Sequence, residues 1–314
     1  MSKAQSKCTS CKRGNTLFFR PYSGQRLCKK CFAQTIEKKV RQTITKYKMF
    51  KFNDKIAVAV SGGKDSLALL QILSKLKTTH PKSPLIAITV DEGIQGYRDE
   101  AIEISAKKCK ELGISQHVVS FEKLFGHTLD NIVAKSRRNA SSELTPCAYC
   151  GILRRRAINI AARNVGATKI VTGHTLDDEV QTVLMNVLRG DIVRLKKEKP
   201  VTDEIHPRFV QKVKPFCEVP EKETALYAYV RKINFQATPC PYASEAYRNE
   251  ARAILNRIEE KYTGTKFTVH NFMERLRPVL KTLELGDTYE ECRECGEPSS
   301  GGLCKVCELL EKMK

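Results

Sequence analysis

Three cysteines near the middle of the chain have the type and setting for metal or sulfur chemistry. Cys147 and Cys150 are two residues apart in the stretch TPCAYC, and Cys240 lies in the stretch TPCPY. Both stretches place a cysteine after Thr-Pro and near a tyrosine, so we predict that each lies in a fixed turn at the mouth of the fold. A thiolate can bind a metal or carry sulfur as a persulfide. Half of a zinc site is a third interpretation, but no fourth ligand has suitable spacing.

Eight further cysteines form two sets of paired Cys-x-x-Cys motifs, one near each end of the chain. The first set is Cys8, Cys11, Cys28 and Cys31, and the second is Cys292, Cys295, Cys304 and Cys307. Each Cys-x-x-Cys turn offers two sulfurs to one tetrahedral ion, so each set predicts a four-thiolate zinc site. We therefore predict two Zn²⁺ in structural modules that also help to hold RNA.

A glycine-rich loop stands between an expected buried strand and an expected helix in the stretch AVAVSGGKDSLALL. Its residues are Ala59, Val60, Ser61, Gly62, Gly63, Lys64, Asp65 and Ser66. The glycines allow a close backbone approach to an anion, and the start of the helix directs N–H groups and its positive dipole end toward that anion. The loop is not a Walker A motif, because Asp65 follows the lysine where that motif requires Ser or Thr.

The elements that must position these residues alternate along the chain from residue 55. Short apolar runs predict buried strands at 55–60, 85–90, 116–121 and 169–174. Amphipathic patterns predict helices at 34–49, 66–76, 98–113, 154–166 and 174–190, with a mainly helical region after 218. Strand–helix alternation of this kind predicts an α/β fold with a doubly wound parallel sheet and helices on both faces.

The expected helix at 174–190 has a recognisable start. Thr175 is the predicted N-cap, and Asp177 and Asp178 are favourably placed in the first turn. The apolar residues at 180, 183, 184, 187 and 188 fall on one helical face. Two other cysteines, Cys109 and Cys217, match no motif, so we expect them to pack in the core.

The composition predicts a folded protein with a polyanionic partner. The chain has 314 residues, of which 41% are hydrophobic, and a formal net charge of +20. A single cluster of Lys and Arg is often only solvated surface, but clusters at 29–51, 154–156 and 189–200 together favour nucleic acid. No apolar stretch is long enough for a membrane span and no signal peptide is evident, so we expect a cytoplasmic protein. In that compartment cysteines are more often ligands or catalysts than disulfides.

The order of the motifs resembles that of the tRNA 2-thiolation proteins of archaea, thermophilic bacteria and the eukaryotic cytosol. The stretch SGGKDS resembles the PP-loop of ATP pyrophosphatases, which split ATP between its α and β phosphates. The stretch TGHTLDDEVQT at 172–182 resembles the second element of that family. With TPCAYCG, TPCPY and a cysteine module at each end, the resemblance covers essentially the whole chain.

This resemblance implies an iron–sulfur site. Cys147, Cys150 and Cys240 match the three cysteines that hold a 4Fe–4S cluster in the family, and three ligands leave one iron open to a sulfur nucleophile. The rival mechanism uses Cys147 or Cys150 as a persulfide carrier and Cys240 as the resolving or acceptor thiol. Both mechanisms stay open on the sequence.

The resemblance also implies an ATP site with Mg²⁺ and a tRNA substrate. Gly173 and Asp178 would lie at the nucleotide, with Asp178 near Mg²⁺. Lys64 and Asp65 are the catalytic candidates of the loop, and Arg154, one helical turn after Cys150, would join Lys64 on the α-phosphate. ATP would adenylate O2 of a tRNA uridine, sulfur would attack C2, and AMP would leave.

Two other classes of function remain open on the sequence. A PP-loop ligase that forms an amide or lysidine without sulfur would leave the three central cysteines without a role. A zinc-module RNA binder without catalysis would leave the ATP motifs without one. Within the first class, the target is the wobble uridine or the T-loop uridine, and we favour the wobble position because the chain resembles archaeal and eukaryotic members. The sulfur donor is free sulfide or a ubiquitin-like thiocarboxylate carrier, and a homodimer is plausible.

The motifs divide the chain into five predicted regions. These are a zinc module at 1–33, a basic linker helix at 34–50, a PP-loop domain at 51–218, a helical region carrying Cys240 at 219–286, and a second zinc module at 287–314.

Overall fold

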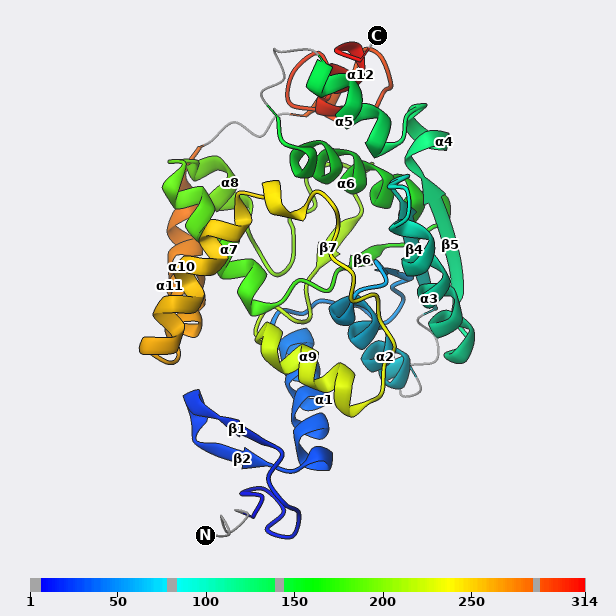
Figure 1. Cartoon of the computed structure of the whole chain (residues 1–314). Coiled ribbons are helices and arrows are strands. Elements are labelled where there is room, and N and C mark those ends of the chain that lie inside the picture. Colours follow the sequence, from blue (N-terminus) through cyan, green and yellow to red (C-terminus); the bar gives the residue numbers. More distant parts are fainter. Residues whose placement is uncertain (1–6, 78–83, 139–143, 285–288, 314) are drawn as a thin grey trace.

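A five-stranded parallel sheet forms the centre of the molecule in the computed structural model, which describes residues 7–77, 84–138, 144–284 and 289–313 (Figure 1). The strand order is β5-β4-β3-β6-β7. The strands are β3 (Ile56–Ala59), β4 (Leu85–Asp91), β5 (Ser115–Ser120), β6 (Lys169–Val171) and β7 (Gln211–Val213). The predicted parallel sheet and its four strands are confirmed, whereas β7 was not predicted because two of its three residues are polar and form no apolar run.

Helices cover both faces of this sheet. On β3, Ile56 and Val58 pack in one core with α2 (Lys64–Lys77), whereas Ala57 packs in another with α6 (Pro146–Asn164). Successive side chains of a strand point to opposite faces, so a strand covered on both faces needs apolar residues at every position. The unbroken apolar run of β3 satisfies that requirement, and the doubly wound arrangement is confirmed.

The other helices follow in chain order. They are α1 (Lys29–Lys46), α3 (Arg98–Glu111), α4 (Phe121–Phe125), α5 (Leu129–Arg138), α7 (Leu176–Leu188), α8 (Ile192–Lys197), α9 (Glu221–Val230), α10 (Arg248–Lys261), α11 (Thr265–Thr282) and α12 (Lys305–Glu311). The five predicted helices are present, but the one expected at 154–166 already begins at Pro146. Cys109 and Cys217 are buried in the core as predicted. None of the helices in the described part of the chain is long and apolar enough to cross a membrane.

Helix α7 begins as predicted but buries only part of its apolar stripe. Val180 and Val183 are buried, whereas Val187 and Leu188 are each 57% exposed. The helix packs against α10 and α11. The apolar residues share one helix as predicted, but the last turn of this helix leaves its apolar side chains exposed.

The N-terminal cysteine module is attached to α9 by a buried ion pair. Its short hairpin consists of β1 (Phe18–Arg20) and β2 (Gln25–Leu27). The guanidinium of Arg20 donates to both carboxylate oxygens of Glu223, at 2.9 and 2.7 Å. Cys31 lies inside α1, so the last cysteine of the module belongs to the same helix as the basic residues that follow it.

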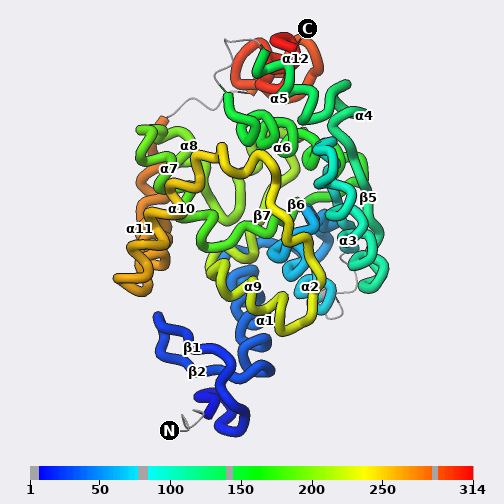
Figure 2. Tube along the Cα trace, in the orientation of Figure 1, coloured from blue at the N-terminus to red at the C-terminus, as the bar shows by residue number. Residues whose placement is uncertain are grey.

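The C-terminal module packs on α6, at the opposite end of the molecule from the N-terminal module (Figure 2). It contains β8 (Glu290–Glu291), β9 (Pro298–Ser299) and α12. Glu297 forms ion pairs with Arg163 and, at 3.1 Å, with Arg156 of α6. Arg156 is therefore part of an interface and not the solvated or RNA-facing residue that its basic cluster suggested.

Candidate nucleotide and sulfur site

The glycine-rich loop lies where the order of the strands reverses. It joins β3 to α2 next to β6, and open α/β sheets bind ligands at this position, beside the carboxyl ends of the strands. Ser61 Oγ lies 3.2 Å from Ser66 Oγ, which also contacts the carbonyl of Gly63 at 3.0 Å. Gly62 has a φ of +84°, and a Cβ there would lie 2.7 Å from the carbonyl oxygen of Ala101. The loop conformation therefore requires glycine at position 62.

Two carboxylates hold the lysine of the loop. Lys64 Nζ lies 2.9 Å from Asp65 Oδ2 and 2.8 Å from Glu221 Oε1 of α9. The other oxygen of Asp65 accepts a hydrogen bond from Thr224. Burial raises the pKa of the Asp65 carboxyl, although Lys64 and Thr224 favour its ionised form. These contacts fasten the start of α2 to α9 and keep the ammonium group of Lys64 at the loop, where a phosphate would bind.

The second predicted nucleotide element touches the loop directly. A Cβ on Gly173 would lie 3.0 Å from the backbone nitrogen of Ser66, so this position also favours glycine. Thr175 is the N-cap of α7, and it forms a capping box in which Asp178 Oδ2 accepts a hydrogen bond from the Thr175 backbone at 2.9 Å. The N-cap prediction is confirmed. The other oxygen, Asp178 Oδ1, takes no part in the capping box and lies 4.0 Å from Arg248 Nη1. The role of Asp178 at Mg²⁺ stays a prediction.

Cys147 and Cys150 lie in the first turns of α6. The helix begins at Pro146 with Thr145 as its N-cap, whose side chain accepts a hydrogen bond from the backbone of Ala148. Proline suits the first helical position and threonine suits the cap, so this local sequence starts a helix. The predicted fixed turn is therefore wrong for Cys147 and Cys150.

The fold brings Cys240 to these two cysteines. Cys147 Sγ lies 3.6 Å from the carbonyl oxygen of Tyr242, and Cys240 packs against the core cluster that contains Cys150. Burial raises the pKa of Cys150 to about 11, and Cys240 and Cys147 act in the same direction while Arg154 opposes it. The predicted grouping of three cysteines from two distant segments is consistent with these contacts.

The segment that leads to Cys240 is joined to the nucleotide loop. The backbone N–H of Gln236 donates to the carbonyl of Gly62 at 3.0 Å, and its side chain donates to the carbonyl of Tyr97 at 2.6 Å. In Figure 1 this yellow segment leads from α9 past the sheet toward α6. The two predicted sites therefore belong to one continuous region.

Arg154 lies on the sulfur side of this region. Its Nη2 donates to Cys150 Sγ at 2.9 Å, and its Nε donates to Glu92 Oε1 at 2.7 Å. Arg154 therefore lies beside Cys150, one helical turn away as predicted, whereas its contact with an α-phosphate stays a prediction. Glu92 is a site residue that the sequence motifs did not predict. The available signal was its position directly after β4, at the carboxyl edge of a parallel sheet.

The terminal cysteine sets have the geometry of zinc sites. A tetrahedral ion with Zn–S bonds of about 2.3 Å places neighbouring sulfurs about 3.8 Å apart. Cys11 Sγ and Cys28 Sγ lie 3.8 Å apart, and Cys295 Sγ and Cys304 Sγ lie 3.7 Å apart. In each set all four sulfurs lie within 4.8 Å of one another.

The central cysteines have a different spacing. In the described ranges, Cys147, Cys150 and Cys240 do not form a group with all sulfurs within 4.8 Å. A cubane cluster binds each thiolate through a separate iron, so its ligands stand farther apart than those of a single ion. The spacing of the central cysteines thus differs from that of the two terminal sets, and their role as cluster ligands stays a prediction.

The sheet, the loop at its switch point and the second glycine element define a PP-loop nucleotide-binding protein. A family model described as ATP_bind_3, PP-loop domain, matches residues 32–258. The tRNA 2-thiolation protein NcsA of Haloferax volcanii is 34% identical over 98% of this chain and 99% of its own length. The cytoplasmic tRNA 2-thiolation protein 1 of Laccaria bicolor is 33% identical over 99% of this chain and 86% of its own length.

A solved structure agrees with these sequence relationships. The U34-tRNA thiolase NcsA of Methanococcus maripaludis, solved with its [4Fe-4S] cluster, superposes with a TM-score of 0.84 and is 33% identical over 98% of this chain and 96% of its own. The chain therefore belongs to the PP-loop family of tRNA 2-thiolation proteins, as its motifs predicted.

Proposed function

We propose that the chain is an ATP-dependent tRNA-uridine 2-sulfurtransferase. The observation that carries this proposal is the contact between the two halves of the site, in which Gln236, four residues before Cys240, bonds the carbonyl of Gly62 in the PP-loop. A sulfur-independent ligase and a non-catalytic RNA binder would each leave one half of this region without a function.

The reaction proceeds in two displacements. O2 of the uridine attacks the α-phosphorus of ATP, and pyrophosphate leaves. Hydrosulfide then adds to C2, and AMP leaves with the former O2, so one ATP and one hydrosulfide yield one 2-thiouridine, AMP and pyrophosphate. Lys64 stabilises the charge on the phosphates, and the N–H groups at the start of α2 face the same anion.

Cys147, Cys150 and Cys240 would hold the iron–sulfur cluster. When bound by three thiolates, such a cluster supplies an open iron for a sulfur ligand. The solved relative NcsA of Methanococcus maripaludis contains a [4Fe-4S] cluster. The cluster mechanism is therefore our proposal, with the persulfide route as its alternative.

We propose the wobble uridine as the target, since the solved relative is a U34-tRNA thiolase. The test combines protein purified without oxygen, ATP, sulfide and tRNA, followed by mass spectrometry of the nucleosides and their positions. One AMP per 2-thiouridine at the wobble position is expected. Thiolation in the T-loop would contradict the target, and AMP release without 2-thiouridine would indicate the sulfur-independent ligase.

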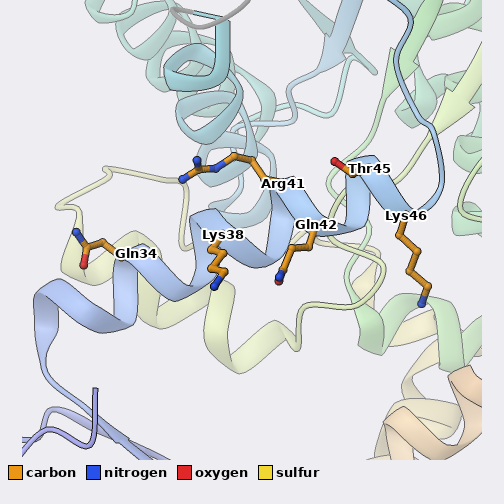
Figure 3. A pocket seen from close by; sticks show the side chains of 6 residues that line it. All are labelled: Gln34, Lys38, Arg41, Gln42, Thr45 and Lys46. Atoms are coloured by element: carbon orange, nitrogen blue, oxygen red, sulfur yellow. The ribbon is translucent and has the colours of Figure 1, made fainter. Parts of the chain in front are cut away.

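One face of α1 is a suitable surface for the tRNA backbone. A groove of about 720 Å³ is lined by Gln34, Lys38, Arg41, Gln42, Thr45 and Lys46 (Figure 3). The groove-lining side chains include three cations, and within the described residues Lys38 and Arg41 have no carboxylate in ion-pair contact. Unpaired cations beside polar groups suit phosphate oxygens. We propose that this groove binds tRNA phosphates.

The double variant Lys38→Glu/Arg41→Glu tests this surface. We expect weaker tRNA binding and a salt dependence reduced by about 1.4 to 1.8 in log–log slope, since each lost phosphate contact removes about 0.7 to 0.9. Fluorescence anisotropy with labelled tRNA at several salt concentrations measures both. The matched control is Lys107→Glu/Lys110→Glu on α3, which makes the same charge change on another helix. Equal losses in both variants would contradict a specific site on α1.

The two terminal cysteine sets are proposed to bind one Zn²⁺ each. Metal analysis is expected to find about two zinc ions per chain, and one in Cys11→Ser or in Cys295→Ser. Loss of the zinc ion from the C-terminal set in Cys295→Ser should loosen the ion pair between Glu297 and Arg163 of α6. Faster proteolysis of the C-terminal module would show this loosening. A zinc content unchanged by either substitution would contradict these sites.

The remaining assignments complete the proposal. The five regions predicted at 1–33, 34–50, 51–218, 219–286 and 287–314 stay as working boundaries, and Mg²⁺ is proposed to accompany ATP. Free sulfide or a ubiquitin-like thiocarboxylate carrier is the sulfur donor, and a homodimer stays a prediction. We propose a cytoplasmic location, in line with the name of the fungal relative.

A further inference from the structure

One buried carboxylate stands between the PP-loop and the cysteines. Glu92 follows β4, and its side chain is only 3% exposed. Its Oε1 accepts a hydrogen bond from Arg154 Nε at 2.7 Å. Its Oε2 lies 2.6 Å from Arg98 Nε. This contact is an ion pair, but its angles are not those of a hydrogen bond. Each oxygen therefore serves a different arginine.

The two arginines act on different halves of the site. Arg98 is 5% exposed, and its Nη1 donates to the carbonyl of Ser61, the first residue of the glycine-rich segment, at 3.0 Å. Arg98 Nη2 donates to the carbonyl of Val90 at 2.5 Å, which fixes the guanidinium on the sheet. Arg154 Nη2 donates to Cys150 Sγ at 2.9 Å. A continuous set of polar contacts thus runs from the loop to a predicted cluster ligand.

The shared carboxylate decides where both guanidinium groups point. The side chain of Arg154 is 46% exposed and can reach solvent, so its contact with sulfur depends on the bond to Glu92. Arg98 is buried and needs a counter-ion, because an unpaired buried charge is strongly unfavourable. Hydrogen bonds to a ligand sulfur raise the reduction potential of an iron–sulfur cluster.

We propose that Glu92 is a positioning residue for thiolation, which holds Arg154 on the sulfur of Cys150 and Arg98 on the carbonyl of Ser61. This inference rests on the proposed function. Glu92 itself contacts neither reacting group, and it acts through the two arginines.

The test measures the reduction potential of the cluster in reconstituted protein. Arg154→Gln removes a donor and a cation, so the potential should become more negative. Glu92→Gln should also make the potential more negative, because Arg154 loses the hydrogen bond that holds it on Cys150. In the double variant Glu92→Gln/Arg154→Gln, the potential should be no more negative than in Arg154→Gln alone. If Glu92 acted only through its own charge, its removal would make the potential more positive, and that result would overturn the proposal.

A second measurement needs no cluster. The affinity of cluster-free protein for a non-hydrolysable ATP analogue should fall about tenfold in Glu92→Gln, the size of one lost hydrogen bond to a charged group. It should be unchanged in Arg156→Gln, a matched variant of α6 whose arginine pairs with Glu297 outside the nucleotide site. If Glu92→Gln does not fold, Glu92→Asp replaces it, since the shorter side chain keeps the charge but cannot reach both arginines. An unchanged affinity in the folded variant contradicts the proposal. Wild type that binds no iron contradicts the proposed cluster mechanism instead, and the affinity measurement still decides the role of Glu92.

Discussion

The Cys240→Ala variant will lose thiolation while it keeps ATP binding. Anaerobically purified wild type should contain about four irons with matching acid-labile sulfide, and the variant almost none, because two thiolates are too few to hold the cluster. Thiolation should fall by more than about 100-fold, since even outer-shell changes at metal sites cost about 10- to 100-fold. The segment before Cys240 bonds Gly62 through a backbone group, which the substitution leaves in place.

Cys109→Ala is the matched control for this experiment. Cys109 is buried in α3, in a different core cluster from Cys150 and Cys240, so the variant should keep both iron and activity. Four irons retained in Cys240→Ala would contradict a three-cysteine cluster. Zinc alone in both proteins would favour the persulfide route, and trapping a persulfide on Cys147 or Cys150 would then be decisive.

The local conformation of the site was predictable from the sequence wherever a short stretch determines its own structure. Thr175 caps α7 because its hydroxyl and the carboxylate of Asp178 satisfy the first N–H groups of the helix, an arrangement that depends on four residues only. The loop at 61–66 is similar, since a strand, two glycines and a helix start define its path. The prediction of a fixed turn at Cys147 and Cys150 was wrong. Thr145 and Pro146 are also local signals, and they start α6 earlier than the apolar pattern alone suggested.

The long-range pairings were not predictable in this way. The three consecutive arginines at 154–156 read as one basic cluster, but successive residues of a helix point about 100° apart. Arg154 consequently reaches Glu92 and Cys150, while Arg156 reaches Glu297 in the C-terminal module. Their partners lie 62 and 141 residues away in the sequence, and only the fold brings them together.

Gly62→Ala will damage the nucleotide site more than any other single-methyl change we consider. Position 62 has a φ of +84°, which costs a residue with a Cβ about 1 to 2 kcal/mol, and the new methyl would lie 2.7 Å from the carbonyl oxygen of Ala101. Relieving that overlap costs about 1 to 3 kcal/mol more, so the free energy of unfolding should fall by about 2 to 5 kcal/mol. The loop must move to accommodate the methyl group, and this movement disturbs the hydrogen bond from the backbone N–H of Gln236 to the carbonyl of residue 62.

Gly113→Ala separates the two causes, because Gly113 has a φ of +63° at the end of α3 with no atom within 4 Å of the added Cβ. Gly113→Ala should lower the free energy of unfolding only by the backbone strain of a positive φ, about 1 to 2 kcal/mol, which is also the strain expected at position 62. It should leave ATP binding unchanged. Denaturant unfolding and ATP-analogue affinity measure both variants. At Gly62 the affinity should fall at least tenfold, which corresponds to about 1.4 kcal/mol of lost binding. Equal effects of the two substitutions on stability and affinity would mean that strain alone matters, and that α3 does not support the loop through Ala101.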